Sequence, residues 1–439
     1  MPLLAFLLAL PFAASAPPSQ AQQPDIPRLE VERYELANGL EVVLLPDSAE
    51  NEVAVELWTH AGSRDEPAGK YGMAHFFEHV LPHGTLMRTG AVVALADSLR
   101  TGSNARTRPD YTRYYQQTVR DGTGLFLLMA ASRLASDPAV DLTEARVEGQ
   151  RERVLAEMQR WVHHRWGEPV GARLARGTFG AAHPYGHDAY GTPEETHATT
   201  RDDLLRWQRA HVRPEYATLF VAGGFDPVGV REYVELAFGR IPGGVRPPRD
   251  APRVPAAPGG RDSLRVAADS SVLFLAWPTP QWAHEDAPLL ELFAHAFAAR
   301  LAEAPGEGVG DASVEAVAGE LAGGFTISLT HASEADAARI EARTREALSD
   351  ALEELTPAEL AAAAAAERER IASYHEELGW IGGRIELVGE SLVFADDPEH
   401  YRRRVERQGS ATVDVVTRAT RAWLGQPAFV LEVEGTGAP

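Results

Sequence analysis

The pattern of hydrophobic and polar positions divides the first half of the chain into short strands and blocks of helix. Two alternating arms between Val31 and Asp47 flank Asn38-Gly39, a dipeptide typical of tight hairpin turns. The remaining elements are predicted as strands at 52–61, 104–119 and 217–222, and as helices around 75–79, at 91–99, 122–136, 142–166, after Pro169, and at 200–211. Strands followed by blocks of helix favour an α+β domain, in which helices cover a mostly antiparallel sheet.

A similar order of elements returns in the second half. Residues 241–261 are rich in Pro, Gly and Arg, so they predict a linker. Beyond it the pattern predicts strands at 271–277, 324–330 and 428–433, and helices at 286–304, 333–355, 357–393 and 411–424. The recurrence indicates a degenerate repeat. We therefore predict an α+β fold of two homologous-like domains, residues 22–240 and 262–439.

Composition and charge fit a soluble globular protein. The chain has 439 residues, 44% hydrophobic and 24% charged, so each half is long enough to bury a large core. The formal net charge of −21 argues against nucleic acid or an anionic membrane surface as a partner. Acidic charge of this size favours basic peptides among possible ligands. The absence of cysteine excludes metal sites that use thiolate ligands.

The N-terminus has the pattern of a secretory signal peptide. An apolar run from Leu3 to Ala14 is too short to span a bilayer, and Ser19-Gln20-Ala21 provides a cleavage site between small residues. The basic start of such a signal is missing, which leaves open a disordered apolar tail. We predict a signal peptide over residues 1–21 and a periplasmic or secreted protein. No later window favours a membrane-spanning helix, so we expect no stable membrane insertion.

The sequence His75-Phe76-Phe77-Glu78-His79 carries the clearest chemistry of the chain. It reads H-x-x-E-H, the inverse of the H-E-x-x-H zinc-protease motif. Residues four apart share one face of a helix, so the two imidazoles can bind one zinc ion. Glu78 then lies beside the metal without binding it, which is the placement that a general base requires. The competing interpretation is a surface helix with two solvated histidines.

A zinc site needs a third protein ligand, and without cysteine a carboxylate is the natural candidate. The predicted helix at 142–166 offers several in the sequence Gln150-Arg151-Glu152-Arg153-Val154-Leu155-Ala156-Glu157-Met158. A rigid helix would hold such a ligand well. From composition alone, however, a solvated helix face is the better explanation of each of these glutamates.

These residues lie within longer segments that resemble the pitrilysin–insulinase family of zinc peptidases. The single-repeat branch, which is similar to mitochondrial processing peptidase, is the closest match. The resemblance is strong over about 30–240 and is carried by the segments Ala61–Pro67, Gly72–His79, Gly84-Thr85, Gly102–Thr107, Asp110–Thr112, Tyr114, Arg153–Met158, His183–Gly186, Gly191–Glu194 and Arg213–Pro227. It implies that residues 22–240 form a catalytic metal-binding domain and that 262–439 form a second, non-catalytic repeat.

The resemblance also assigns roles to individual residues. It implies that Zn²⁺ binds to His75, His79 and Glu157, with Glu78 as the catalytic base. Asn104 and Ala105 match a strand that the family places beside the metal site, where an extended peptide could add as a further strand. The competing interpretation of Asn104 is a side chain that caps a turn.

Two departures from the family pattern concern the metal region. Active members have a second glutamate seven positions before the third ligand, whereas this chain has Gln150. An amide can support the site by hydrogen bonding, but it lacks the charge that would tune it. Pro82-His83 replaces a common aromatic–lysine pair, and Pro82 with the following glycine argues against His83 as a further ligand.

A third departure concerns substrate binding. The second domain of the family usually provides an arginine and, seven residues later, a tyrosine that hold the substrate backbone. Arg300 fits the start of this region, but residues 302–310 contain no tyrosine. We therefore expect a homo- or heterodimer in which a related subunit supplies this Arg/Tyr clamp.

The sequence thus predicts a zinc-dependent endopeptidase that cleaves extended peptides or unfolded protein segments. One alternative is a weakly active or inactive relative that serves as a binding or assembly subunit, which Gln150 and the missing tyrosine favour. Another is a zinc hydrolase that does not act on peptides. The third ligand and the flanking segments argue for the peptidase.

Overall fold

The computed structural model describes residues 26 and 28–437, apart from 82–89, 136–141, 165–167, 256–258, 305, 307, 333–335 and 380–381. The predicted signal peptide at 1–21 and the pair Pro82-His83 lie outside the described residues.

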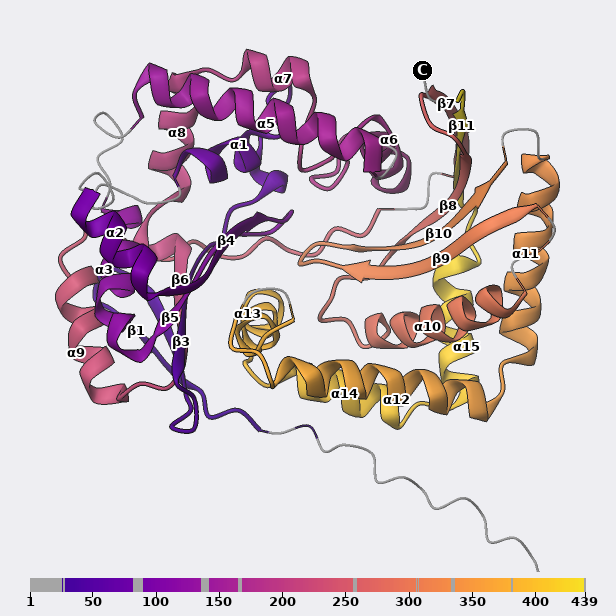
Figure 1. The fold of residues 1–439 in the computed structure, drawn as a ribbon. Coiled ribbons are helices and arrows are strands. Elements are labelled where there is room, and N and C mark those ends of the chain that lie inside the picture. Colours follow the sequence, from indigo (N-terminus) through magenta and orange to yellow (C-terminus); the bar gives the residue numbers. More distant parts are fainter. Residues whose placement is uncertain are drawn as a thin grey trace, which may run out of the picture.

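Two mixed sheets, each covered by helices, form the framework of the molecule (Figure 1). The six-stranded sheet contains β1 Glu32–Glu35, β2 Glu41–Pro46, β3 Glu52–Thr59, β4 Arg100–Thr107, β5 Thr112–Val119 and β6 Ala217–Gly223. The five-stranded sheet contains β7 Gly260–Val266, β8 Ser271–Thr279, β9 Val309–Ala318, β10 Gly323–His331 and β11 Phe429–Gly435. The predicted α+β fold with mostly antiparallel sheets is confirmed.

Both sheets have the same topology. The strand order is β1-β2-β6-β3-β5-β4 in the first sheet and β7-β11-β8-β10-β9 in the second. Apart from β1, the two orders are identical when strands are counted along the chain. In each sheet the first and last of these strands form the one parallel pair, β2 with β6 and β7 with β11. The repeat that the sequence indicated is therefore visible in the strand connections.

Helices fill the intervals between the strands. In the first half these are α1 Met73–Val80, α2 Gly90–Leu99, α3 Thr123–Leu134, α5 Glu144–His164, α6 Glu168–Phe179, α7 Pro193–Ala198, α8 Arg201–His211 and α9 Pro227–Phe238. In the second half they are α10 Ala287–Glu303, α11 Ala337–Glu354, α12 Pro357–Tyr374, α13 Arg384–Ala395, α14 His400–Gly409 and α15 Val413–Leu424. None of the described helices combines the length and apolar character that a bilayer crossing requires.

Several element boundaries differ from the sequence-based prediction. The single strand predicted at 104–119 is a hairpin of β4 and β5, whose register pairs Thr107 with Thr112. The single helix predicted at 357–393 is α12 followed by α13, because the glycine-containing segment between them interrupts the helix. The strand β7 begins at Gly260, inside the predicted linker. Like β9, α7, α9 and α14, it had no predicted counterpart. Alternation and periodicity locate elements well but do not locate the breaks between adjacent ones.

Elements of the second half complete the core of the first sheet. One face of this sheet packs against the metal-motif helix α1 and against α3 within the larger hydrophobic cluster. The other face presents Trp58 and Phe220 to residues of α13, such as Val388 and Leu392. Figure 1 shows α13 beside β3 and β5, with α14 next to it and the strands of the second sheet further away.

The first half in turn contributes a helix to the core of the second sheet. Helix α6 of the first half packs on β7, β8 and β11 of the second sheet. Val170 of α6 belongs to one hydrophobic cluster with Val272, Phe429 and Leu431. Polar contacts join the halves as well, because Arg384 at the start of α13 donates hydrogen bonds to Asp47 at 2.7 Å and to Glu50 at 2.8 Å. The two halves are therefore held together by shared cores.

We predict that Gly389 is required for α13 to pack on the first sheet. A Cβ atom at this position would lie 2.7 Å from Cη2 of Trp58, a fully buried side chain. Gly389→Ala should therefore lower the free energy of unfolding by about 1–3 kcal/mol through overpacking. The matched control is Gly149→Ala on α5, where the added atom would meet nothing within 4 Å; it should stabilise the protein by up to about 1 kcal/mol. Denaturant midpoints measure both changes, and equal midpoints for the two variants would contradict this packing.

Candidate metal centre

Helix α1 carries the H-x-x-E-H motif, and its N-terminus is fixed by a buried carboxylate. Glu66 accepts hydrogen bonds from the backbone N–H groups of Gly72 at 2.8 Å and Ala74 at 2.7 Å. These groups belong to the first turn, where helical N–H donors lack partners within the helix and an anion is favoured. Gly72 has φ +83°, and a Cβ atom there would lie 2.2 Å from the carbonyl oxygen of Tyr190. The sequence therefore needs glycine at this point for the helix to begin against the 190 loop.

Helix α5 packs against α1 and carries Glu157, the predicted third ligand. Arg151 is buried, and its guanidinium lies 5.1 Å from the ring centre of Phe76 on α1. The same guanidinium donates to the carbonyl oxygens of Thr196 and, at 2.9 Å, of Thr199. These contacts fix the position of α5 relative to α1 and thereby the position of Glu157 one and a half turns further along.

The Nε2 atoms of His75 and His79 and the carboxylate of Glu157 lie close together. The two Nε2 atoms of the histidines lie 3.2 Å apart. Glu157 Oε1 lies 3.7 Å from Nε2 of His75, and Oε2 lies 3.2 Å from Nε2 of His79. Ligands about 2.0–2.1 Å from a tetrahedral ion are separated by roughly 3.3–3.4 Å. The three groups therefore have the spacing of a zinc ligand set.

Glu78 is the second carboxylate within reach. Its oxygen and the two imidazole nitrogens lie within 4.8 Å of one another, so distance alone would also allow it to bind a metal. However, Glu78 Oε2 accepts a hydrogen bond from the Thr107 hydroxyl at 2.6 Å. Thr107 is the last residue of β4, so the edge strand of the sheet holds this carboxylate to one side of the imidazoles. Glu157, by contrast, directs both of its oxygens at them.

The protonation states suit these positions. Burial, and then the neighbouring His79, lower the pKa of His75 to about 4, so its imidazole is neutral near pH 7, which is the form that binds metals. Burial raises the pKa of Glu78 to about 7, despite the Thr107 hydrogen bond. A carboxyl group with this pKa can both accept and return a proton near neutral pH. The ring of Tyr190 packs edge-on against His75 at 4.6 Å and shields that side.

The remaining predicted site residues lie on β4 and on α5. Asn104 and Ala105 lie on β4, the edge strand that ends at Thr107. Asn104 is exposed, and its side-chain oxygen accepts a hydrogen bond from the backbone N–H of Ala105 at 2.9 Å. Gln150 lies two turns before Glu157 on α5, and no hydrogen bond joins it to the histidines or to Glu157 among the described residues. The structure thus brings together the residues of the motif and Glu157, with the β4 edge beside them.

Arg300, which fits the start of the family clamp, is engaged elsewhere. Its guanidinium forms two hydrogen bonds with Glu359 of α12, at 2.5 and 2.8 Å, and donates a third to the Glu354 carbonyl oxygen. The tyrosines of the second half are also occupied: Tyr374 accepts from Arg370 at 2.7 Å and Tyr401 is buried.

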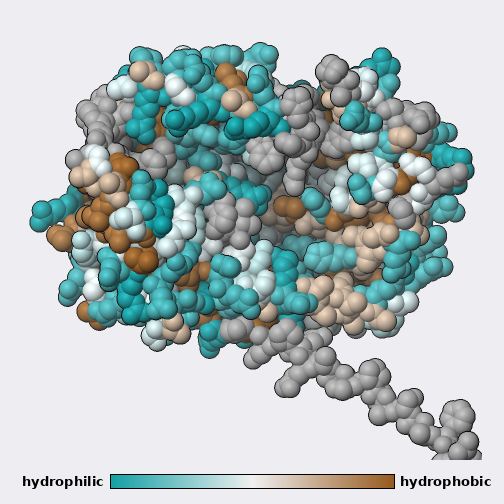
Figure 2. Space-filling view, viewed as in Figure 1, coloured by the Kyte–Doolittle hydropathy of each residue, from teal (hydrophilic) through white to brown (hydrophobic). Residues whose placement is uncertain are grey.

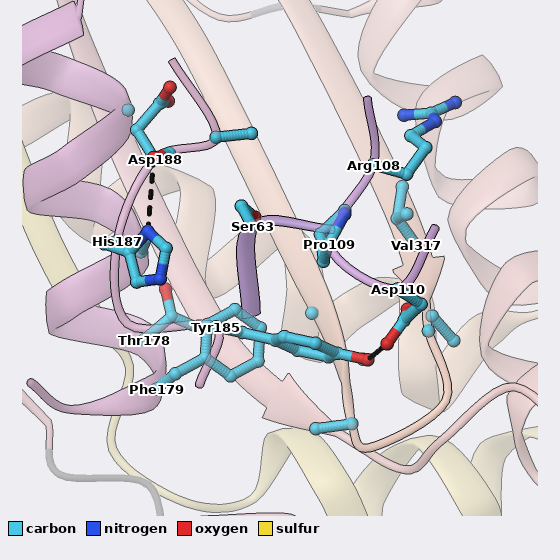
Figure 3. Close-up of a pocket in the computed structure, with 18 of the residues that line it drawn as sticks. Ser63, Arg108, Pro109, Asp110, Thr178, Phe179, Tyr185, His187, Asp188 and Val317 are labelled. Atoms are coloured by element: carbon cyan, nitrogen blue, oxygen red, sulfur yellow. Dashed lines mark hydrogen bonds between the residues drawn. The ribbon is translucent and has the colours of Figure 1, made fainter. Parts of the chain in front are cut away.

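A cavity of about 350 Å³ lies between the two halves (Figure 3). Its walls include Phe179, Ala189 and Val317, and Ala189 directly precedes the Tyr190 that packs on His75. At its base, Asp110 accepts hydrogen bonds from Tyr185 at 2.5 Å and from the Glu320 backbone N–H at 3.2 Å, which joins the halves. Figure 2 shows the surface hollowed between the two halves on this face.

Sequence reasoning gave no role to Glu66, Thr107 or Tyr190, although Glu66 and Thr107 lie in segments that carry the family resemblance. Thr107 could have been found, because alternation along the strand places it on the same face as Ala105, toward the helix. Glu66 and Tyr190 had no comparable signal. Glu66 precedes the helix by seven residues, which is outside any capping spacing, and Tyr190 reaches His75 only through the folding of a loop.

Comparison with known proteins supports this interpretation. Residues 41–180 match the insulinase family, peptidase family M16, and residues 198–367 match the peptidase M16 inactive domain. An uncharacterized zinc protease of Streptomyces coelicolor is 29% identical over 238 residues, which are 54% of this chain and 50% of that protein. A probable mitochondrial-processing peptidase subunit beta of Arabidopsis thaliana is 29% identical over 209 residues, 47% of this chain and 38% of that protein.

Solved structures agree on the fold. The crystal structure of a protease from Helicobacter pylori superimposes with a TM-score of 0.80 at 20% identity, covering 92% of this chain and 99% of that one. The matched region spans about half the length of the curated relatives. The two family matches together cover most of the chain and include the H-x-x-E-H motif. The chain therefore belongs to the insulinase family of peptidases, family M16, as the sequence predicted.

Proposed function

We propose that this protein is a zinc-dependent endopeptidase that cleaves extended peptides or unfolded protein segments. The observation that carries the proposal is the triangle of His75, His79 and Glu157, whose edges of 3.2–3.7 Å match a zinc ligand set. The naming of relatives as zinc proteases supports the choice of metal. Gln150 is a supporting residue in this proposal.

Each residue has a separate task in the proposed reaction. When bound, zinc supplies Lewis-acid polarisation of the attacking water and of the scissile carbonyl. Glu78 accepts the proton of the attacking water and later returns it to the amine that leaves. The Thr107 hydroxyl holds the Glu78 carboxylate in place, and burial keeps its pKa near the pH at which both transfers are feasible.

The edge of β4 is the proposed substrate-binding strand. It pairs only with β5 among the described strands, so its outer side is free for a peptide to add along Asn104 and Ala105. A peptide in this position would pass Thr107 and therefore Glu78. Residues 22–240 would then form the catalytic domain and 262–439 the second domain of the proposed enzyme, joined by the linker 241–261.

A partner subunit would complete substrate binding. Arg300 is paired with Glu359, and the described residues of the β9 region contain no tyrosine to join it. A related chain in a homo- or heterodimer could supply the missing Arg/Tyr clamp. We place the enzyme in the periplasm or outside the cell, on the strength of the predicted signal peptide.

The alternative is a subunit that binds peptides without cleaving them. The match of 198–367 to an inactive domain and the replacement of the second glutamate by Gln150 favour it. It leaves unexplained why Glu78, His75, His79 and Glu157 converge as they do. Replacing Glu78 separates the two functions, because a binding subunit would not depend on it.

We predict that Glu78→Gln abolishes cleavage while retaining zinc. The amide keeps the shape of the side chain but cannot accept the water proton, so kcat should fall by about 10²–10⁴-fold. Hydrolysis of an unstructured, fluorogenic peptide measures activity, and plasma emission spectrometry measures bound zinc. The control is Glu152→Gln, an exposed glutamate on α5. Unchanged hydrolysis by the Glu78 variant would exclude this mechanism.

We predict that Glu157→Ala weakens zinc binding. Loss of a residue that merely supports a ligand lowers metal affinity by about 10–100-fold, so loss of a ligand should cost at least 100-fold. Competition with a chelator measures the affinity, again with Glu152→Gln as the control. Tight zinc binding by the alanine variant would show that Glu78, not Glu157, is the third ligand.

We predict an acidic limit of activity set by Glu78. The base must be deprotonated, and burial raises its pKa from 4.5 toward about 7, so kcat/KM should fall as the pH drops through this interval. A bound cation shifts the limit toward the lower end of the interval. The pH–rate profile, recorded with bound zinc measured at each pH, tests this. A profile that is flat from pH 7 down to 4.5 with zinc retained would contradict it.

A further inference from the structure

Two arginines lie at the end of β4, the edge strand that we propose binds the substrate. Arg106 lies on β4, and Arg108 follows the last residue of this strand. The pair shares one face of the strand, opposite Thr107, because successive side chains alternate. The main chain of Arg108 is fixed, since its N–H donates to the Tyr111 carbonyl oxygen at 2.8 Å and its carbonyl oxygen accepts from the Ser63 N–H at 3.2 Å.

Neither guanidinium is in direct contact with a carboxylate in the part of the chain that the structure describes. No side-chain hydrogen bond and no ion pair within 4.0 Å involves Arg106 or Arg108 there. Most other partly buried arginines of the molecule are paired; Arg113, directly opposite Arg106 on β5, pairs with Glu386 at 3.4 Å. Unpaired charge in a partly buried place is costly, so its retention points to a ligand.

The carboxylates that face the pair, Glu386 and Glu390, act on it through longer-range charge but form their hydrogen bonds with other groups. Glu386 accepts from Arg113 and from the Gly382 N–H, and Glu390 accepts from the Tyr111 hydroxyl at 3.0 Å. The pKa of Arg106 is lowered, first by burial and then by the charges of Arg108 and Arg113, which outweigh Glu386. The charges nearest to Arg106 are therefore predominantly positive, although the whole chain carries −21.

The pair is also linked to the cavities through Arg108 and to the metal centre through Thr107. Arg108 lines both the 350 Å³ cavity and a neighbouring one of about 300 Å³ (Figure 3). Between the two arginines lies Thr107, which holds Glu78. Arg106 is close enough for its charge to act on Tyr190, the residue that packs on His75. A peptide along β4 would thus meet both guanidiniums within a few residues of the bond to be cleaved.

We propose that Arg106 and Arg108 select acidic substrates by pairing with carboxylate side chains at alternating positions of the bound peptide. This inference rests on the proposed function. Residues two apart on a strand are about 6.6–6.8 Å apart, and side chains on neighbouring strands face each other at about 4.5–5.5 Å. Two arginines at this spacing therefore match an acidic–any–acidic sequence in an added strand. Each pair would form at a site shielded from bulk water, where charge–charge contacts are stronger.

The inference differs from the expectation based on composition. The net charge favours basic peptides at long range, but salt screens that attraction within about 10 Å at 0.1 M. Selection at the site depends on the groups that touch the substrate. In this protein the groups that would touch the substrate along β4 are the guanidiniums of Arg106 and Arg108. Their preference for acidic side chains should therefore outweigh the long-range attraction of basic peptides.

The test compares three fluorogenic peptides that differ only at two alternating positions, which carry Glu-x-Glu, Gln-x-Gln or Lys-x-Lys. The zinc-loaded full-length protein should cleave the Glu peptide with a kcat/KM at least tenfold above the Lys peptide. Combined replacement R106E and R108E should reverse this order, and R106Q with R108Q should remove it. Arg265→Gln is the matched control, because Arg265 is exposed and pairs with Glu434 on the second sheet, so the preference should persist.

A binding experiment separates this inference from the proposed function. Anisotropy titration of the same labelled peptides with the Glu78→Gln protein reports charge selection without cleavage. Cleavage with no difference between the Glu and Lys peptides, or a preference that survives R106E with R108E, would overturn the inference and leave the peptidase standing. Selective binding of the Glu peptide without cleavage by the unmodified protein would overturn the peptidase and leave the inference standing.

Discussion

The close approach of two imidazoles and a carboxylate from separate helices is the constraint on which the rest of the site depends. Polar groups that crowd within 3.2–3.7 Å and lose water are unfavourable by themselves, so the surrounding fold must hold them there. The Glu66 carboxylate fixes the start of α1, and Arg151 fixes α5 against it. Such supporting contacts decide whether ligands on two helices meet at one point.

The two halves share a topology but have separate tasks. Both sheets have the same strand order, yet the described part of the second half contains no cluster like that of His75, Glu78 and His79. Its contribution is architectural: α13 completes the core behind the first sheet, while α6 of the first half packs on the second. This reciprocal packing encloses the cavities between the halves and fixes their walls relative to the metal centre.

Charge in this protein must be considered at two scales. The overall excess of acidic residues acts at long range, whereas Arg106 and Arg108 place positive charge at the end of the edge strand. The metal centre itself is acidic through Glu78 and Glu157, which lie on the opposite side of β4 from the arginines. A peptide on this strand would therefore have a different electrostatic environment on each face.

The sequence by itself determined the motif helix, the α+β class and the repeat, and the family resemblance predicted Glu157 as the third ligand. These are local patterns of spacing and periodicity, and they are legible because helices and strands have fixed periods. Only the tertiary structure decided that Thr107 holds Glu78, that Arg300 is paired with Glu359, and that Arg106 and Arg108 form no direct ion pair among the described residues. Such pairings join residues far apart in the chain, and the packing that brings them together leaves no trace in local composition.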